Sequence, residues 1–208
     1  MADAAATTGT LHDLAPCWSC KGPVSARAPF CHACGAIQPP RALDHFSRLN
    51  LPVRFDLDPA DIEKQYFGLQ RYFHPDRFAA KSAKERALSL QHATNLNRAY
   101  ETLKQPLGRA EYLLELQGRK IDGEATIADA GLLMEAMEWR EELAQAGDRA
   151  AVDAIIDRAG QVFDAKVAAI GEAFARDDLA GAAKLATALR YFSKLIDEAR
   201  ARRARLEA

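Results

Sequence analysis

The sequence predicts an all-α protein that carries a small metal-binding module at its N-terminus. Apolar residues recur at helical spacing in long stretches from about residue 43 to the end of the chain. Prolines and glycines separate these stretches, as expected for connections between helices. Four cysteines, arranged in two close pairs, lie within the first 34 residues. A length of 208 residues allows one or two ordinary domains.

The composition is typical of a globular protein rather than of a nucleic-acid-binding or membrane protein. Hydrophobic residues make up 49% of the chain, charged residues 27%, and the net charge is -1. Residues 1–40 contain only two basic side chains, too few to neutralise a run of phosphates. No stretch has the roughly eighteen continuous apolar residues of a membrane span. The N-terminal residues match neither a secretory signal nor a transit peptide, so a cytoplasmic location is expected.

The N-terminal cysteines predict a zinc site. We expect residues 1–15 to be a disordered lead-in and residues 16–38 to form the module, in which ten residues separate two Cys-x-x-Cys pairs. Four thiolates suit a tetrahedral zinc ion, and such a site is structural because no coordination position stays open for chemistry. The predicted ligands are Cys17, Cys20, Cys31 and Cys34.

Two disulfides or two redox-active pairs are the alternatives at these cysteines. A reducing cytosol disfavours disulfides, and a thiol oxidoreductase usually has one such pair in an α/β pattern, whereas no strands are evident here. His32, inside the second pair, is expected to be exposed rather than a ligand. We also expect that metal removal unfolds residues 16–36 and barely changes the melting of the helical part.

Residues 41–116 are predicted to form a helical domain built around an exposed turn. Residues 37–40 (IQPP) are interpreted as a stiff linker into it, and a short helix precedes Pro52. A long helix then starts at Pro59, with one apolar stripe and a basic outer face. Pro75 ends this helix because it excludes His74 from the helical conformation. The stripe consists of Ile62, Tyr66, Leu69 and Phe73, and the outer face carries Lys64 and Arg71.

The turn His74-Pro75-Asp76 leads into a second long helix, antiparallel to the first. No nucleophile or second carboxylate accompanies the turn, so it is not a complete catalytic site. His92 lies on the apolar stripe of the second helix and is expected to be a satisfied core or boundary histidine. A short helix from Pro106 to Leu116 completes the domain. Residues 117–126, with two glycines, are the predicted linker to a three-helix bundle over residues 127–208.

Residues 129–146 predict a helix with two distinct faces. One face would enter the bundle core through Leu132, Ala136, Trp139 and Leu143. The opposite face carries apolar residues and two carboxylates, and packing against the rest of the chain is one explanation for it. The other is a docking surface, because leucine and methionine with a charged rim suit recognition of a partner. This second face consists of Leu133, Met134, Met137, Glu138 and Glu141.

Several motifs resemble a known family. The His-Pro-Asp turn and the string ATNLNRAYETLKQPLGRAEY resemble a J-domain, the module that stimulates DnaK-type chaperone ATPases. LLMEAMEWREEL and LRYFSKL, which follow, resemble the HscB family of iron–sulfur co-chaperones. The resemblance implies an L-shaped protein that is not an enzyme. The four-cysteine extension resembles that of animal members, which would place a eukaryotic chain in the mitochondrial matrix.

The resemblance also implies two protein partners and no nucleic-acid or membrane partner. The J-domain would engage a DnaK-type chaperone ATPase of the HscA type through His74, Pro75, Asp76, Lys64, Arg71 and Arg77. The bundle would bind an IscU-type scaffold through Leu133, Met134, Met137, Glu138, Glu141 and Tyr191. Tyr191 lies off the apolar stripe of its predicted helix, so we expect it to be exposed.

Three other functions are compatible with parts of the sequence. A J-protein for general protein folding would bind unfolded chains without preferring a scaffold. A zinc-ribbon nucleic-acid binder would need a basic, aromatic-rich face that residues 1–40 do not supply. A thiol redox enzyme would show free thiols and no zinc after purification.

Overall fold

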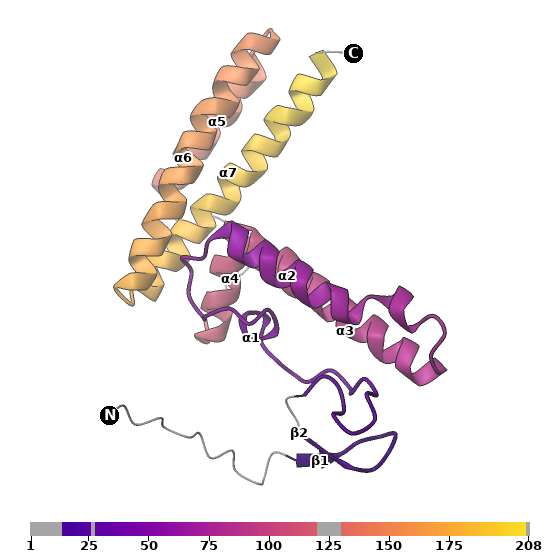
Figure 1. Cartoon of the computed structure of the whole chain (residues 1–208). Helices are drawn as coiled ribbons and strands as arrows, with labels where there is room; N and C mark the ends of the chain where they lie inside the picture. The colour runs from indigo at the N-terminus through magenta and orange to yellow at the C-terminus, as the bar shows by residue number, and fades with distance from the viewer. Residues whose placement is uncertain (1–13, 26–27, 120–129, 207–208) are drawn as a thin grey trace, which may run out of the picture. The chain divides into compact units, whose positions relative to one another are not determined.

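The structure is a computed structural model that describes residues 14–25, 28–119 and 130–206. Within these residues the protein is mainly helical, as predicted, with one pair of short strands (Figure 1). The chain divides into two compact units, one of residues 1–51 and 60–100 and one of residues 52–59 and 101–208. In the described part of the chain no helix is long and apolar enough to cross a membrane.

The N-terminal module contains two strands that the sequence did not predict. Strands β1 (Leu14–Pro16) and β2 (Pro23–Ser25) pair antiparallel, with Ala15 opposite Val24. Leu14 and Ala15 therefore belong to the module, and the expectation that the disordered lead-in extends to residue 15 is wrong. The rest of that lead-in, residues 1–13, lies outside the described residues. Strands this short have no visible alternation in the sequence, which explains why the pattern missed them.

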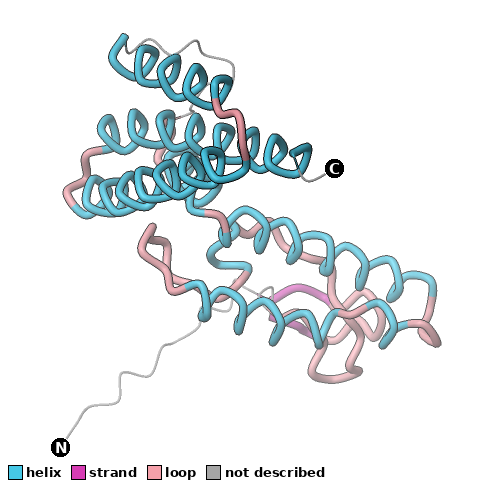
Figure 2. Tube along the Cα trace, turned by 90° about the horizontal axis from the view of Figure 1, so that it is seen from above, coloured by secondary structure: helices cyan, strands magenta, loops and turns pink. Residues whose placement is uncertain are grey.

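The predicted helical hairpin is present in the first unit. Short helix α1 (His45–Arg48) precedes α2 (Pro59–Phe73), a 3-10 turn η2 (Pro75–Phe78) and α3 (Ala83–Lys104). Figure 2 shows α2 and α3 side by side.

The stripe of α2 faces α3 as predicted. Ile62, Tyr66 and Phe73 are buried, and Leu69 is partly buried. The Tyr66 hydroxyl donates to Asn97 Oδ1 (2.8 Å), and its ring stacks on Tyr100 with 4.1 Å between centroids. These contacts set the register of the hairpin.

The stretch interpreted as a stiff linker, residues 37–40, is partly a packed segment. Ile37 and Gln38 are buried, and Ile37 forms a β-bridge with Phe30. Nε2 of His92 on α3 donates to the Gln38 carbonyl (2.9 Å), which confirms the expectation of a satisfied histidine. The interpretation as a linker is therefore wrong for Ile37 and Gln38, which contact the cysteine module and α3, and it stays a prediction for Pro39 and Pro40.

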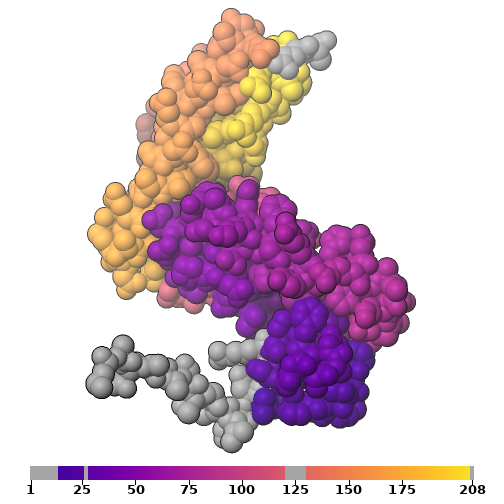
Figure 3. Space-filling view, viewed as in Figure 1, coloured from indigo at the N-terminus to yellow at the C-terminus, as the bar shows by residue number. Residues whose placement is uncertain are grey.

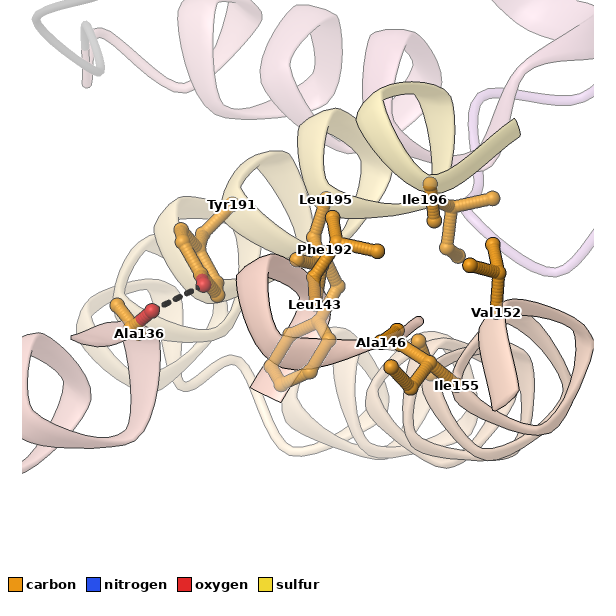
Figure 4. Close-up of a cluster of buried hydrophobic side chains, with 11 residues drawn as sticks. Ala136, Leu143, Ala146, Val152, Ile155, Tyr191, Phe192, Leu195 and Ile196 are labelled. Carbon is orange, nitrogen blue, oxygen red and sulfur yellow. Dashed lines mark hydrogen bonds between the residues drawn. The ribbon is translucent and has the colours of Figure 1, made fainter. Parts of the chain in front are cut away.

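The second unit holds the C-terminal helices. Helices α5 (Ala130–Gln145), α6 (Arg149–Ala175) and α7 (Leu179–Leu206) form the predicted bundle, in which α6 and α7 run along each other (Figure 1). Many of the buried side chains of this bundle belong to one core cluster, much of it visible in Figure 4. The cluster contains Ala136, Leu143, Ala146, Val152, Ile155, Ala159, Tyr191, Phe192, Leu195, Ile196 and Ala199.

Helix α4 (Pro106–Leu116) packs on α7 within this unit. The sequence pattern places α4 in the 41–116 domain, whereas its contacts group it with the C-terminal helices. It buries Ala110, Leu113 and Leu114, and its Glu111 pairs with Arg190 of α7. Of the predicted linker 117–126, residues 117–119 are described and close the end of α4, where Gly118 has a φ of 75°.

Candidate functional site

The cysteines lie on two tight turns of similar construction. In the turn between β1 and β2, the Lys21 amide donates to the Cys17 carbonyl (3.0 Å). In the second turn, the Gly35 amide donates to the Cys31 carbonyl (2.7 Å). Lys21 and Gly35 adopt positive φ values of 64° and 74°, which lets the chain curl back after each pair. Each turn thereby brings both of its sulfurs to the same side.

The four sulfur atoms form one cluster. All lie within 4.8 Å of one another, with Cys17 3.8 Å from Cys34 and Cys20 3.7 Å from Cys31. Four thiolates at the usual zinc–sulfur distance of about 2.3 Å stand about 3.8 Å apart at the corners of a tetrahedron. The predicted ligands are therefore positioned to bind one metal ion, and disulfide pairing is absent among these described cysteines.

Hydrogen bonds favour the ligand form of one cysteine. Burial raises the pKa of the Cys17 thiol, but hydrogen bonds with the backbone at Cys20 and Ser19 and with the Gln38 amide lower it to about 6. The Gln38 Nε2 lies 3.4 Å from Cys17 Sγ and 2.8 Å from the Ala36 carbonyl. At Cys20 a hydrogen bond with the Gly22 backbone lowers the pKa, but the neighbouring Cys34 thiol and burial raise it to about 11. Thiolates are the metal-binding form of cysteine, so the protein environment favours that form at Cys17 but not at Cys20.

The His-Pro-Asp turn is exposed at the end of α2. His74 caps η2, and its Nδ1 accepts a hydrogen bond from the Asp76 amide (3.3 Å). The same Nδ1 lies 3.5 Å from Asp76 Oδ2, and the Asp76 side chain is 90% exposed. Arg77 Nη1 donates to the Arg71 carbonyl (3.0 Å), which ties the turn to the last turn of α2. The turn is ordered locally, and its carboxylate is open to a partner.

The outer face of α2 is positively charged beside this turn. Lys64 and Arg71 are exposed, and neither forms an ion pair within the described ranges of the chain. Two exposed aromatic residues, Phe67 and Tyr72, lie on the same helix. This combination of cations and exposed rings offers both charge and apolar area for contact with another protein.

Helix α5 presents an apolar face to solvent. Leu133, Met134 and Met137 are 43%, 63% and 63% exposed, and Glu138 and Glu141 are exposed beside them. The opposite face enters the bundle through Leu132, Ala136 and Leu143, with Trp139 partly buried against the core. The prediction of a helix with two faces is confirmed, and in the described residues nothing covers the second face.

Tyr191 does not have the exposure that the sequence predicts. Its side chain is 6% exposed, and its hydroxyl donates to the Ala136 carbonyl of α5 (2.5 Å; Figure 4). The expectation of an exposed tyrosine was wrong because α7 has two neighbours here. Core residues on α5 and α6 both pack against it, so residues well off the main stripe of α7 are buried too.

Three residues near the cysteines have contacts that the sequence pattern does not predict. Gln38 contacts Cys17, the Trp18 Nε1 donates to the Ile37 carbonyl (2.6 Å), and Phe30 stacks on Phe73 of α2. An aromatic residue directly after the first ligand was the only sequence signal for any of them. Their roles depend on a fold of the module that the spacing of the cysteines does not specify.

Comparisons with known proteins agree on one family. The family model described as the HSCB C-terminal oligomerisation domain matches residues 128–200. The mouse iron–sulfur cluster co-chaperone protein HscB is 39% identical over 88% of this chain and 80% of its own length. The human co-chaperone protein HscB structure matches with a TM-score of 0.85 and 34% identity, over 90% of this chain and 98% of that chain. The structure of the chaperone HscB from Vibrio cholerae matches with a TM-score of 0.71 and 36% identity, over 79% of this chain and 99% of that chain.

Proposed function

The chain belongs to the HscB family of co-chaperones, and we propose that it binds an IscU-type iron–sulfur scaffold and presents it to a DnaK-type chaperone of the HscA type. Its mouse relative is named an iron–sulfur cluster co-chaperone, which supports this class of cargo. The chain itself needs no catalytic residue in this role, because ATP hydrolysis takes place on the chaperone.

The exposed face of α5 carries the proposal. Three large apolar side chains in contact with water have no structural benefit where they stand, whereas Leu132 and Leu143 of the same helix are buried. Such a patch, rimmed by Glu138 and Glu141, is typical of a protein-binding surface. We assign the apolar residues to the centre of the scaffold interface and the two carboxylates to its rim, where charge mainly affects the rate of encounter.

Tyr191 is buried behind the exposed apolar face of α5 and helps to hold this helix in place. Its hydroxyl holds the backbone of α5 at Ala136, one residue before Met137. In the proposal Tyr191 is a positioning residue that fixes the rotation of α5 and hence the direction in which the apolar face points.

The turn and the outer face of α2 form the second proposed surface. The Asp76 carboxylate, together with His74, contacts the chaperone and promotes hydrolysis of its ATP. Positive charge on this surface attracts an acidic surface of the chaperone, which speeds the encounter and orients the two proteins. The charge comes from Lys64, Arg71 and Arg77. Because the turn and the α5 face belong to different units of the chain, scaffold and chaperone have separate binding surfaces.

The four cysteines hold a structural zinc ion in this proposal. Their sulfur spacing fits the tetrahedral coordination that zinc prefers, and four protein ligands leave no position for a substrate. The ion would stabilise the module by joining its two turns, since such a small segment has little core of its own.

The scaffold surface is tested by changing Leu133, Met134 and Met137 together to Ala. We expect the melting temperature to change little and scaffold affinity, measured by calorimetry, to fall by about a hundredfold or more. Leu132→Ala is the matched control, because this neighbouring leucine is buried and its truncation should cost about 2–5 kcal/mol of stability. Unchanged affinity of the triple variant would place the docking site elsewhere.

The chaperone surface is tested with Asp76→Asn and His74→Gln. Both variants should bind the scaffold normally and fail to stimulate the chaperone ATPase. The triple α5 variant should do the opposite, stimulating the ATPase without scaffold but no longer recruiting it. Full stimulation by both turn variants at saturating concentration would rule out this part of the proposal, and binding to unfolded chains instead of the scaffold would favour a J-protein for general folding.

A further inference from the structure

The cysteine module contacts both ends of the loop that carries the His-Pro-Asp turn. We call residues 74–82, between α2 and α3, the HPD loop. Phe73 immediately precedes this loop, and Lys84 lies in the first turn of α3 immediately after it. Module residues touch both, and Figure 3 shows the indigo N-terminal atoms packed against the adjoining part of the chain.

At the first end of the loop, three rings form a stack. Phe30 of the module lies 5.6 Å from Phe73, centroid to centroid, at 7°, and Phe73 lies 4.3 Å from His92 of α3 at 6°. Phe73 thus stands between the module and α3. Its carbonyl also accepts a hydrogen bond from Ser89 Oγ (2.8 Å), so its backbone is held by α3 and its ring by both neighbours.

At the second end, the contact is between a cation and a ring. The Lys84 ammonium lies 4.4 Å from the centroid of Trp18, a residue between the first two cysteines. The Trp18 indole is itself fixed by its hydrogen bond to the Ile37 carbonyl. Because Trp18 lies between Cys17 and Cys20, its position depends on the geometry of the first cysteine pair.

Gln38 connects the sulfur cluster to the hairpin directly. Its side chain donates to Cys17 Sγ, and its backbone carbonyl accepts from His92, the third ring of the stack. One residue therefore joins a ligand atom to a side chain that packs on Phe73. Two contacts of the module therefore reach residues that flank the HPD loop, and a third reaches His92, which packs on one of them.

We propose that the metal-bound module is a brace for the HPD loop, so that metal occupancy controls how well the His-Pro-Asp turn is ordered. The metal joins the two turns that position Trp18 and Phe30, and its loss releases both from the hairpin. This inference goes beyond the proposed function, and only its consequence for the chaperone ATPase rests on that function.

Amide hydrogen exchange in the full chain tests the brace without any partner. Hydrogen-bonded amides of the loop include those of Asp76, Arg77, Ala79, Lys81 and Ser82. Chelator-treated protein should exchange peptides over residues 73–82 about twofold to tenfold faster than zinc-loaded protein, as expected when one ring stack is lost. Peptides of α6 and α7 should be unchanged. Equal exchange of the loop in both states would overturn the proposal.

A variant that keeps every ligand separates bracing from metal binding. Phe30→Leu removes the ring from the stack and should keep a full equivalent of zinc, yet it should reproduce the faster exchange of the loop. His32→Ala is the matched control, because His32 is exposed in the same module and should change neither zinc content nor loop exchange. Loop exchange in Phe30→Leu that equals that of His32→Ala would also overturn the brace.

Chaperone assays then distinguish this inference from the proposed function. Phe30→Leu should require a higher concentration for half-maximal ATPase stimulation, while its scaffold affinity stays native. If the native chain does not stimulate any chaperone, the proposed function fails, but the exchange result still decides whether the brace exists.

Discussion

His92 is a buried ionisable side chain of the hairpin, and its environment opposes protonation. Burial lowers the pKa of His92 below its ordinary value of about 6.5, and the Arg48 guanidinium lowers it further, whereas the hydrogen bond to the Gln38 carbonyl raises it in part. The unfolded chain therefore binds this proton more readily than the folded chain. The resulting stabilisation is complete above about pH 6.5 and is lost as the pH falls towards the folded-state pKa.

We predict that His92→Gln reduces the pH dependence of stability. A glutamine amide can still donate to the Gln38 carbonyl but has no proton to gain. Urea unfolding at pH 7.5 and at pH 5.5, with zinc content measured at both, should show a smaller loss on acidification in the variant. An equally steep loss in both proteins would assign the acid sensitivity to other groups.

Tyr191 determines how α5 attaches to α7. We predict that Tyr191→Phe lowers stability by about 0.5–1.5 kcal/mol, because the Ala136 carbonyl loses a buried hydrogen bond while the ring stays in place. Thermal melting measures this loss. Tyr72→Phe is the control, since this tyrosine is 59% exposed and its change should stay within about 0.5 kcal/mol. Equal effects of the two changes would contradict a role for the Tyr191 hydroxyl.

At the level of secondary-structure elements, an ion pair between Glu111 and Arg190 joins α4 to α7. Arg190 donates from Nε and Nη2 to Glu111 Oε1 at 3.0 Å and 2.7 Å. The side chains are only 26% and 34% exposed, so water screens this pair less than a surface pair. The pair lies on an interface that local periodicity did not reveal.

We predict that Glu111→Gln destabilises the second unit by about 0.5–1.5 kcal/mol, with a smaller effect at high salt. Glu172→Gln provides the comparison. It removes an exposed i,i+4 partner of Arg176, which should contribute only about 0.3–0.5 kcal/mol. Urea unfolding at low and high salt measures both. A loss at Glu111 no larger than that at Glu172 would show that the α4–α7 pair does not contribute beyond an ordinary surface pair.

At the scale of the whole molecule, the two compact units should respond differently to metal removal. The sequence predicted local unfolding of residues 16–36 with the helices barely affected, because the module looked independent. Phe30, Trp18 and Gln38 pack on the hairpin instead. We now expect chelation to lower the melting temperature of the α2–α3 hairpin as well, while the bundle of α5, α6 and α7 keeps its own.

The two tryptophans report this difference separately. Trp18 lies in the module and Trp139 in α5. In the Trp139→Phe variant only Trp18 remains, so its fluorescence follows the first unit. In the Trp18→Phe variant only Trp139 remains, so its fluorescence follows the second unit. Chelation should shift the thermal transition of the first variant and leave that of the second in place. A shift of both would mean that the units melt together, and a shift of neither would mean that the metal does not stabilise the first unit.

Features that depend on local chemistry could be predicted from the amino-acid sequence alone. Apolar periodicity predicts the helices, and Pro75 predicts the exposed turn after α2. The spacing of the two Cys-x-x-Cys pairs predicts the cluster of four sulfur atoms, because each tight turn directs both of its sulfurs to the same side. The two faces of α5 could also be predicted, because the distribution of residues around a helix depends only on the sequence of that helix. The motifs in these stretches were also enough to indicate the family.

The residues that each surface packs against became apparent only from the three-dimensional fold. A helical wheel places Tyr191 relative to its own axis, but its burial depends on α5 and α6 both lying against α7. The packing of Phe30 on Phe73, the bridge made by Gln38 and the attachment of α4 to α7 join residues far apart in the chain. Burial is a property of neighbours, and neighbours distant in sequence leave no periodic signal in either partner.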